Sequence, residues 1–339
     1  MNWTDVAGQD RAVRVLRSAL VRDQAHHAYL LAGPAGVGKE LLARVFALAA
    51  NCEAEQPEAR PCGVCSHCRA IARGNFPDVM WVMPQSEMVA RGLISRADLE
   101  TAPSKEIRVD EIRALAKRLS LAALRGRRKV AIVTPAEAIN ERAQNTLLKT
   151  LEEPPPATTF LLLSANPDAL LPTIRSRCAR VQLGPVPEEL IVARLLRDGV
   201  PEPVARERAA RAQGSFSRAL VEEGEHRPLL EAVERALAAA DERDALDIAE
   251  QHGEREDALW AALSLQAWTR DLLVAQAGGV VEHRELQPLA VEIAGRFSAA
   301  VLLGQAQVCG DVIEALEQNG NGRLQLERLL LRSRELRNG

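Results

Sequence analysis

The sequence predicts a parallel α/β domain followed by a region built only of helices. Three observations predict it: short apolar runs alternate with helical periodicity up to about residue 183, a glycine-rich loop joins the first run to a helix, and strand patterns nearly vanish after residue 185. With 339 residues and 47% apolar composition, the chain is long enough for two or three domains with separate cores. A disordered chain, a collagen and a small stapled scaffold are excluded.

The elements follow in order along the chain. The expected strands of the α/β domain are residues 28–32, 79–83, 130–133, 160–163 and 181–183. The expected helices between them are residues 12–21, 41–50, 109–119 and 143–153, the last ended by three prolines. Residues 84–105 form a long polar excursion. We assign residues 1–183 to this α/β domain.

The helical region divides in two. Residues 188–197, 204–213 and 216–223 have the spacing of a small three-helix unit, which gives a second domain at 184–225. From residue 226 to 339 the chain is rich in Leu and Ala at helical spacing, with breaks at 278–279 and 319–322. This last part predicts an all-α bundle.

Charge and aromatic content limit the classes of partner. The formal net charge of −3 gives no bulk attraction to phosphate backbones, so a contact with nucleic acid needs a local basic patch or partner subunits. Aromatic residues make up only 3% of the chain, which argues against a base-stacking platform. The first ten residues lack a signal pattern and no eighteen apolar residues run together, so we expect a cytoplasmic protein without membrane contact.

Residues 33–40, GPAGVGKE, have the pattern of a phosphate-binding loop between a strand and a helix. Gly33, Gly36 and Gly38 would shape a cradle of backbone N–H groups, and Lys39 would reach the β- and γ-phosphates. The last position is Glu40 where a Ser or Thr normally holds Mg²⁺, and a carboxylate there would face phosphate oxygens. The alternative is a turn with no ancestry in phosphate binding.

The second half of a hydrolytic site is also missing. The strand at 130–133 should end in acidic residues that hold Mg²⁺ and orient water, but it runs into Thr134 and Pro135. Glu137 lies beyond the strand, and we expect it to cap or solvate the next helix. ATP binding is therefore doubtful and ATP hydrolysis is not expected.

Four of the six cysteines lie within seventeen residues, in a module at about 52–68. Their spacing suits a closed tetrahedral Zn²⁺ site with a structural role, with the ligands Cys52, Cys62, Cys65 and Cys68. An iron–sulfur cluster and free or disulfide-bonded thiols are the alternatives, and His67 could replace a neighbouring thiolate. We expect Cys178 and Cys309 to pack in cores.

The densest basic run is Arg125-Gly-Arg127-Arg128-Lys129. A solvated loop at the entry to a strand is the expected interpretation, and contact with DNA phosphates inside a complex is the alternative.

Together with these motifs, NTLLKTLEEPP at 145–155 and Ser176-Arg177-Cys178 make the chain resemble the clamp-loader branch of the AAA+ family along its whole length. The resemblance implies a lid at 184–225 and an oligomerising collar at 226–339. The absent metal-binding residues resemble the stator-like member of the bacterial DNA polymerase III loader. That member stands beside the delta subunit and the gamma or tau motor subunits in a hetero-oligomer acting on the sliding clamp and primed DNA.

The resemblance also implies a role for Arg177, which would reach across a subunit interface to ATP held by the neighbour. Pairing with a local carboxylate is the alternative for Arg177 and the favoured one for Arg175. Arg218 is displaced by one position from the lid arginine of the motor subunits, and Ser164 and Ala165 both remain candidates for the sensor position. Two other functions stay open: a working clamp-loader ATPase and a zinc-dependent DNA-binding protein.

Overall fold

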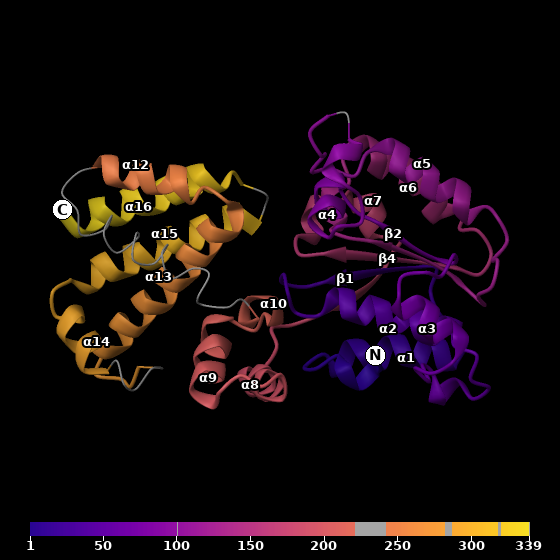
Figure 1. Ribbon diagram of the computed structural model, residues 1–339, viewed down its shortest axis with the longest axis horizontal. Coiled ribbons are helices and arrows are strands. Elements are labelled where there is room, and N and C mark those ends of the chain that lie inside the picture. The colour runs from indigo at the N-terminus through magenta and orange to yellow at the C-terminus, as the bar shows by residue number, and fades with distance from the viewer. Residues whose placement is uncertain (100, 221–241, 282–286, 318–319, 339) are drawn as a thin grey trace. The chain divides into compact units, whose positions relative to one another are not determined.

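A computed structural model describes residues 1–99, 101–220, 242–281, 287–317 and 320–338 (Figure 1). The chain divides into two compact units, one of residues 1–190 with 214–216 and one of residues 191–213 with 217–339. The three-domain division expected above stays a prediction. Its second boundary, at residues 225 and 226, lies outside the described residues.

The first unit is built on a five-stranded parallel sheet with the order β2-β3-β4-β1-β5. Its strands are β1 (Ala28–Ala32), β2 (Val79–Val82), β3 (Lys129–Val133), β4 (Thr158–Ser164) and β5 (Ala179–Gln182). Every residue of β1, β3 and β4 is buried, which explains their nearly continuous apolar runs. The expected α/β fold class is confirmed.

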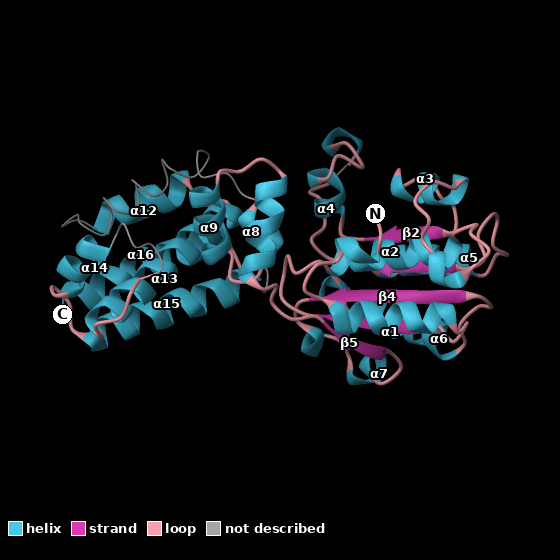
Figure 2. Ribbon diagram, turned by 90° about the horizontal axis from the view of Figure 1, so that it is seen from below, coloured by secondary structure: helices cyan, strands magenta, loops and turns pink. Residues whose placement is uncertain are grey.

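Helices cover both faces of this sheet. Figure 1 shows α1 (Asp10–Val21) and α2 (Lys39–Asn51) on one face and α5 (Val109–Leu119) and α6 (Glu141–Glu152) on the other, and Figure 2 shows the same layers from below. The α5 and α6 side holds a core of Leu30, Val133, Phe160 and their neighbours, all nearly inaccessible to water. Three prolines follow α6 and end it, as expected.

Several short elements have no periodic signal in the sequence. They are α3 (Ser66–Ala72), α4 (Gln85–Ala90), α7 (Pro172–Arg175), and the 3₁₀ turns at Trp3–Asp5, Pro57–Ala59, Arg96–Asp98, Ala136–Ala138 and Pro167–Ala169. Each is too short for a hydrophobic repeat, and only some of them begin at a side-chain cap. In α3, for example, the Cys65 sulfur accepts a hydrogen bond from the backbone N–H of Cys68.

The second unit is entirely helical in the part that the structure describes. Its helices are residues 191–197 of α8 (Glu188–Arg197), α9 (Glu202–Arg211), α12 (Glu242–Gln251), α13 (Arg255–Gln276), α14 (Gln287–Ala294), α15 (Ala299–Glu317) and α16 (Gly322–Asn338). Of the helix expected at 216–223, the structure has α10 (Phe216–Ala219), and residues 221–223 lie outside the described ranges. The expected break at 278–279 follows α13.

Among its described residues, two hydrophobic cores hold this unit together. The larger packs α12, α13, α15 and α16 around residues such as Leu316 and Leu329, and the smaller surrounds Leu272 and Leu302. By length and composition alone α15 could cross a membrane, with a mean hydropathy of 1.3 over residues 299–316. Cys309, as expected, is fully buried in the larger core.

A buried carboxylate organises the loop before β3. Asp78 accepts hydrogen bonds from the backbone N–H groups of Leu124 (2.8 Å), Arg125 (2.8 Å) and Gly126 (2.6 Å). Burial alone would raise the pKa of Asp78, but these three N–H groups outweigh it and hold the pKa below its usual value. Lys129 caps the carboxyl end of α5 by donating to the carbonyls of Leu119 and Leu121. The basic run is thus fixed at one end by Asp78 and at the other by the bonds of Lys129 to the end of α5.

We predict that Asp78→Asn lowers the free energy of unfolding by about 3 kcal/mol at pH 7, because the amide cannot accept all three bonds and places an N–H against another N–H. Because the folded pKa of Asp78 is lowered, its contribution is complete above the unfolded pKa of about 4 and is lost as the pH falls through the folded value. Denaturant titration of both proteins at several pH values should show the difference shrinking in acid. Asp110→Asn, at an exposed position on α5, is the control. An unchanged difference down to pH 3 contradicts the argument.

Candidate functional site

The loop at 33–38 leaves the carboxyl end of β1 and enters α2, as a phosphate-binding loop does. Gly33 packs so closely on the residue after β5 that a Cβ would lie 2.4 Å from the Leu183 carbonyl oxygen. Gly38 caps α2 in the left-handed region, at φ +98°. The backbone therefore needs glycine at both positions, and the loop has the shape that the sequence predicts.

Within this loop the lysine is turned onto its own backbone. The Lys39 Nζ donates to the carbonyl oxygens of Gly33 (2.5 Å) and Pro34 (2.6 Å). In a loop that holds nucleotide, the same ammonium group faces the β- and γ-phosphates.

Glu40 is bound by an arginine that the sequence analysis missed. Arg91, which follows α4 in the polar excursion, donates from Nη2 to Glu40 Oε1 (2.8 Å) and from Nη1 to Oε2 (3.0 Å). The bond to Glu40 raises the pKa of Arg91, and Glu87 adds a second ion pair at 3.1 Å. The expectation that Glu40 faces phosphate oxygens was therefore incomplete, because a fork-to-fork ion pair occupies its carboxylate.

The end of β3 completes the arrangement. The Thr134 hydroxyl donates to Glu40 Oε1 at 3.2 Å, so a hydroxyl and a carboxylate still meet across the loop. Their places are exchanged: an ordinary site has the hydroxyl on the loop and the carboxylate at the strand end. Because Thr134 and Pro135 carry no charge, this strand end offers no anionic metal ligand.

The prediction for Glu137 was wrong. Its Oε1 accepts a hydrogen bond from the backbone N–H of Ala165 (3.0 Å) at the end of β4, while Asn140 caps α6. The 3₁₀ turn at Ala136–Ala138 carries the side chain back over the sheet instead of onto the next helix. Ser164, one of the two sensor candidates, has a buried hydroxyl with no partner among the described residues.

Arg177 lies between α7 and β5, at the amino end of β5, whereas the loop follows the carboxyl end of β1. Its Nη2 donates to Glu152 Oε1 at 2.7 Å, and its Nη1 donates to the Thr173 carbonyl at 2.9 Å. Arg175 pairs with Asp168. Both arginines therefore have a carboxylate partner within the chain.

The four cysteines of the module come together. Their sulfur atoms all lie within 4.8 Å of one another. Tetrahedral Zn²⁺ with Zn–S bonds of about 2.3 Å places sulfurs about 3.8 Å apart, so a small adjustment would seat an ion. The residues present fit zinc.

Backbone N–H groups already point at these sulfurs. Cys62 donates to the Cys52 sulfur (3.3 Å), Cys65 to that of Cys62 (3.4 Å) and Cys68 to that of Cys65 (3.3 Å). Hydrogen bonds of this kind lower the pKa of Cys62 to about 7, and the backbone N–H of Val64 contributes more than that of Cys65. Burial, by contrast, raises the pKa of Cys52. The thiolate, which is the form that binds metal, is therefore favoured at Cys62, whereas burial raises the pKa of Cys68 as it does that of Cys52.

Three further predictions concern His67, Cys178 and the basic run at 125–129. His67 is not one of the four clustered ligands, because its Nδ1 bonds to the Asn51 carbonyl at 2.9 Å and its Nε2 lies 3.5 Å from Glu53. Cys178 is buried, as expected, in the core on the α5 and α6 face of the sheet. In the basic run only part of the solvated-loop interpretation is right, because Lys129 is buried and Arg125 lies over the Phe76 ring.

Comparison with known proteins gives three findings. The family described as "DNA polymerase III, delta subunit" matches residues 8–187. The tau subunit of Escherichia coli DNA polymerase III is 31% identical over 89% of this chain and 46% of its own length. The delta' subunit of Pseudomonas aeruginosa is 39% identical over 54% of this chain and 51% of its own length. The chain thus spans about half the length of these curated relatives.

Among solved structures, a DNA polymerase III gamma subunit-related protein from Thermotoga maritima matches 97% of this chain and 99% of its own. The TM-score is 0.45 and the sequence identity is 17%.

We predict that the purified chain carries about one zinc ion, and that Cys65→Ser loses it together with thermal stability of the module, because three thiolates leave the coordination shell open. Metal analysis and thermal unfolding are the measurements. Cys178→Ala, which removes a buried thiol outside the cluster, should keep its zinc. Iron absorption, or a metal-free protein of unchanged stability, would contradict the assignment.

Proposed function

Because the chain belongs to the DNA polymerase III delta subunit family, we propose that it is a non-hydrolysing, stator-like subunit of the replicative clamp loader. In this role it stands beside delta and the gamma or tau motor subunits in a cytoplasmic hetero-oligomer. It helps to place the sliding clamp on primed DNA and supplies Arg177 to ATP bound by a neighbour.

The observation that carries the first half of this proposal is the ion pair of Glu40 with Arg91. A magnesium site at the loop needs a free hydroxyl at position 40 and a carboxylate at the end of β3. Here the carboxylate of Glu40 is neutralised by the guanidinium of Arg91, and the residue after β3 is Thr134. Nucleotide binding without turnover remains compatible with the loop, whereas metal-assisted hydrolysis lacks its support.

The topology of the sheet supports the second half of the proposal, which is the action of Arg177 on a neighbour's ATP. The phosphate loop follows the carboxyl end of β1, and Arg177 precedes the amino end of β5, which pairs with β1 in parallel. A strand of five residues is about 16 Å long. Arg177 and the loop therefore lie at opposite ends of the paired strands β1 and β5. This separation supports the proposal that Arg177 acts on a phosphate outside its own loop.

The local contact of Arg177 is one that a partner could replace. The Arg177 side chain is 35% exposed and that of Glu152 is 50% exposed. Exposed pairs of this kind contribute about 0–1 kcal/mol, because water screens them. A phosphate group offers a guanidinium charge-assisted bonds of the same kind, so exchange of Glu152 for a neighbour's phosphate costs little.

Similarity to the tau subunit of Escherichia coli over 89% of this chain favours a second candidate, a working clamp-loader ATPase. Glu40, Thr134 and Pro135 argue against it for the reasons above. The zinc module serves either candidate in the same way, by holding the segment between α2 and β2 in place.

We predict that Arg177→Ala leaves zinc content, folding and assembly with delta and motor subunits intact but slows clamp loading by about ten-fold or more, since arginines acting in trans contribute about 10³–10⁵ in rate at a single site. ATP hydrolysis stimulated by clamp and primed DNA should fall with it. Arg177→Lys should rescue poorly, because a point charge does not reproduce the planar fork.

Arg175→Ala is the matched control for this experiment, since it removes the same charge two residues away and its partner is Asp168. It should assemble and load clamps at the normal rate. Normal clamp loading by a correctly assembled Arg177→Ala complex would contradict the proposal. Failure of that variant to assemble would also contradict it and would assign Arg177 a structural role.

A further inference from the structure

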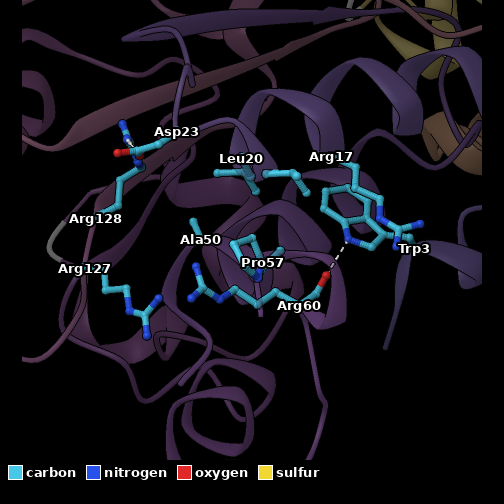
Figure 3. A pocket seen from close by; sticks show the side chains of 11 residues that line it. Trp3, Arg17, Leu20, Asp23, Ala50, Pro57, Arg60, Arg127 and Arg128 are labelled. Atoms are coloured by element: carbon cyan, nitrogen blue, oxygen red, sulfur yellow. Dashed lines mark hydrogen bonds and ion pairs between the residues drawn. The ribbon is translucent and has the colours of Figure 1, made fainter. Parts of the chain in front are cut away.

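A hollow beside the zinc module gathers arginines from three separate segments (Figure 3). Its volume is about 90 Å³, and its lining includes Arg17 of α1, Arg60 of the module, and Arg127 and Arg128 of the loop before β3. We call this cavity the basic hollow. Nothing in the family match or in the nucleotide site assigns it a role.

The positive charges of the basic hollow are held in place mainly by neutral groups. Arg60 donates to the carbonyls of Ala54 (2.8 Å) and Glu55 (2.9 Å), and Arg17 donates to the Glu58 carbonyl at 3.0 Å. Carbonyl oxygens orient a guanidinium without neutralising it. These arginines are therefore pre-organised and keep their charge for an anion.

The remaining two arginines differ in their partners. Arg128 donates to the Thr159 hydroxyl at 3.2 Å and lies 3.6 Å from Asp23, whose side chain is 95% exposed. Arg127 is exposed and has no hydrogen-bond or ion-pair partner within the described part of the chain. Apolar groups of Leu20, Ala50 and Pro57 complete the lining, and such low-dielectric walls strengthen the field inside a cavity.

The basic surface continues along α1. A second, open groove of about 440 Å³ is lined by Arg11, Arg14 and Arg22, each exposed and without an ion pair in the described residues. Arg17 lies on the same helix, at the edge of the basic hollow. Together the two hollows are lined by seven arginines, and Asp23 is the one carboxylate among the described residues that line them.

We propose that the basic hollow and the α1 groove bind the phosphodiester backbone of a single nucleic-acid strand. One phosphate would occupy the hollow, between Arg60 and Arg127, and its neighbours along the strand would contact the arginines of α1, a helix about 18 Å long. The row of separate guanidinium groups fits a chain of phosphates better than one isolated anion. Trp3, the aromatic residue of the hollow, is 5% exposed and bonded to the Arg60 carbonyl, so it offers no face for stacking a base.

Binding should therefore be independent of base sequence and strongly dependent on salt. This inference does not depend on the role of Arg177 or on the state of the phosphate loop. It also limits the conclusion drawn from net charge, because a chain at −3 overall can present a local surface of opposite sign.

The test measures the binding of labelled oligo(dT) to the zinc-loaded full chain by fluorescence anisotropy, between about 50 and 200 mM salt. The test variant is the double substitution Arg14→Gln and Arg127→Gln, which avoids Arg17 and Arg60 because both of those side chains also hold carbonyl groups of the zinc module. The control is Arg113→Gln with Arg206→Gln, which removes the same charge from side chains that are 70% and 65% exposed elsewhere.

We expect the wild-type chain to bind in the micromolar range at low salt and the test variant to bind about ten-fold more weakly. The slope of log K against log salt should decrease in magnitude by about 1.4, or about 0.7 for each phosphate that no longer meets an arginine. The control variant should match the wild type in both. Equal weakening of both variants, or absence of binding to the wild type, overturns the proposal.

Inorganic phosphate at matched ionic strength separates a strand from a single anion. We expect it to displace oligo(dT) no better than chloride does, because one phosphate cannot span the hollow and the groove. Full displacement by phosphate would show a discrete anion site and contradict the assignment to a strand.

Discussion

The contact between Glu40 and Arg91 decides what the phosphate loop can do. A carboxylate beside a phosphate cradle would repel a nucleotide unless a cation neutralises it, and Arg91 does so with two short bonds while Thr134 adds a third. Lys39 turns back onto the loop carbonyls. The chain therefore keeps the shape of a phosphate loop, and our proposal that it does not hydrolyse ATP rests on this contact. In the proposed assembly, the neighbour would contact the opposite ends of the strands, where Arg177 precedes β5.

Much of the fold follows from the sequence because its elements are long or strongly patterned. Residues 109–119 and 188–197 form helices at the predicted bounds, since an apolar face repeats through each of them, and residues 28–32 form a strand because every side chain there is apolar and buried. The helix at Ser66–Ala72 could not be predicted, because it begins at a cysteine whose sulfur acts as a cap. Its start depends on the metal module and not on periodicity.

The candidate site was predictable only where its residues are neighbours in the sequence. The cysteine spacing predicted a cluster that the sulfur positions now permit, and Glu40 was correctly identified as a departure from the loop pattern. Arg91 was missed because it lies 51 positions from Glu40 in a polar excursion without a repeat. Glu137 was misassigned because a single turn reverses its direction, and the basic hollow was missed because its arginines come from three segments.

The most direct test of the central claim is whether Mg²⁺ changes the affinity of the isolated chain for ATP. A site with metal ligands binds the magnesium complex more tightly than free nucleotide, because the metal bridges protein and phosphate oxygens. Titration of the chain with ATP in Mg²⁺, and in EDTA at equal ionic strength, should give the same weak affinity, or none, in both. Affinity that rises about ten-fold or more with Mg²⁺ and is lost in Lys39→Ala would contradict the account.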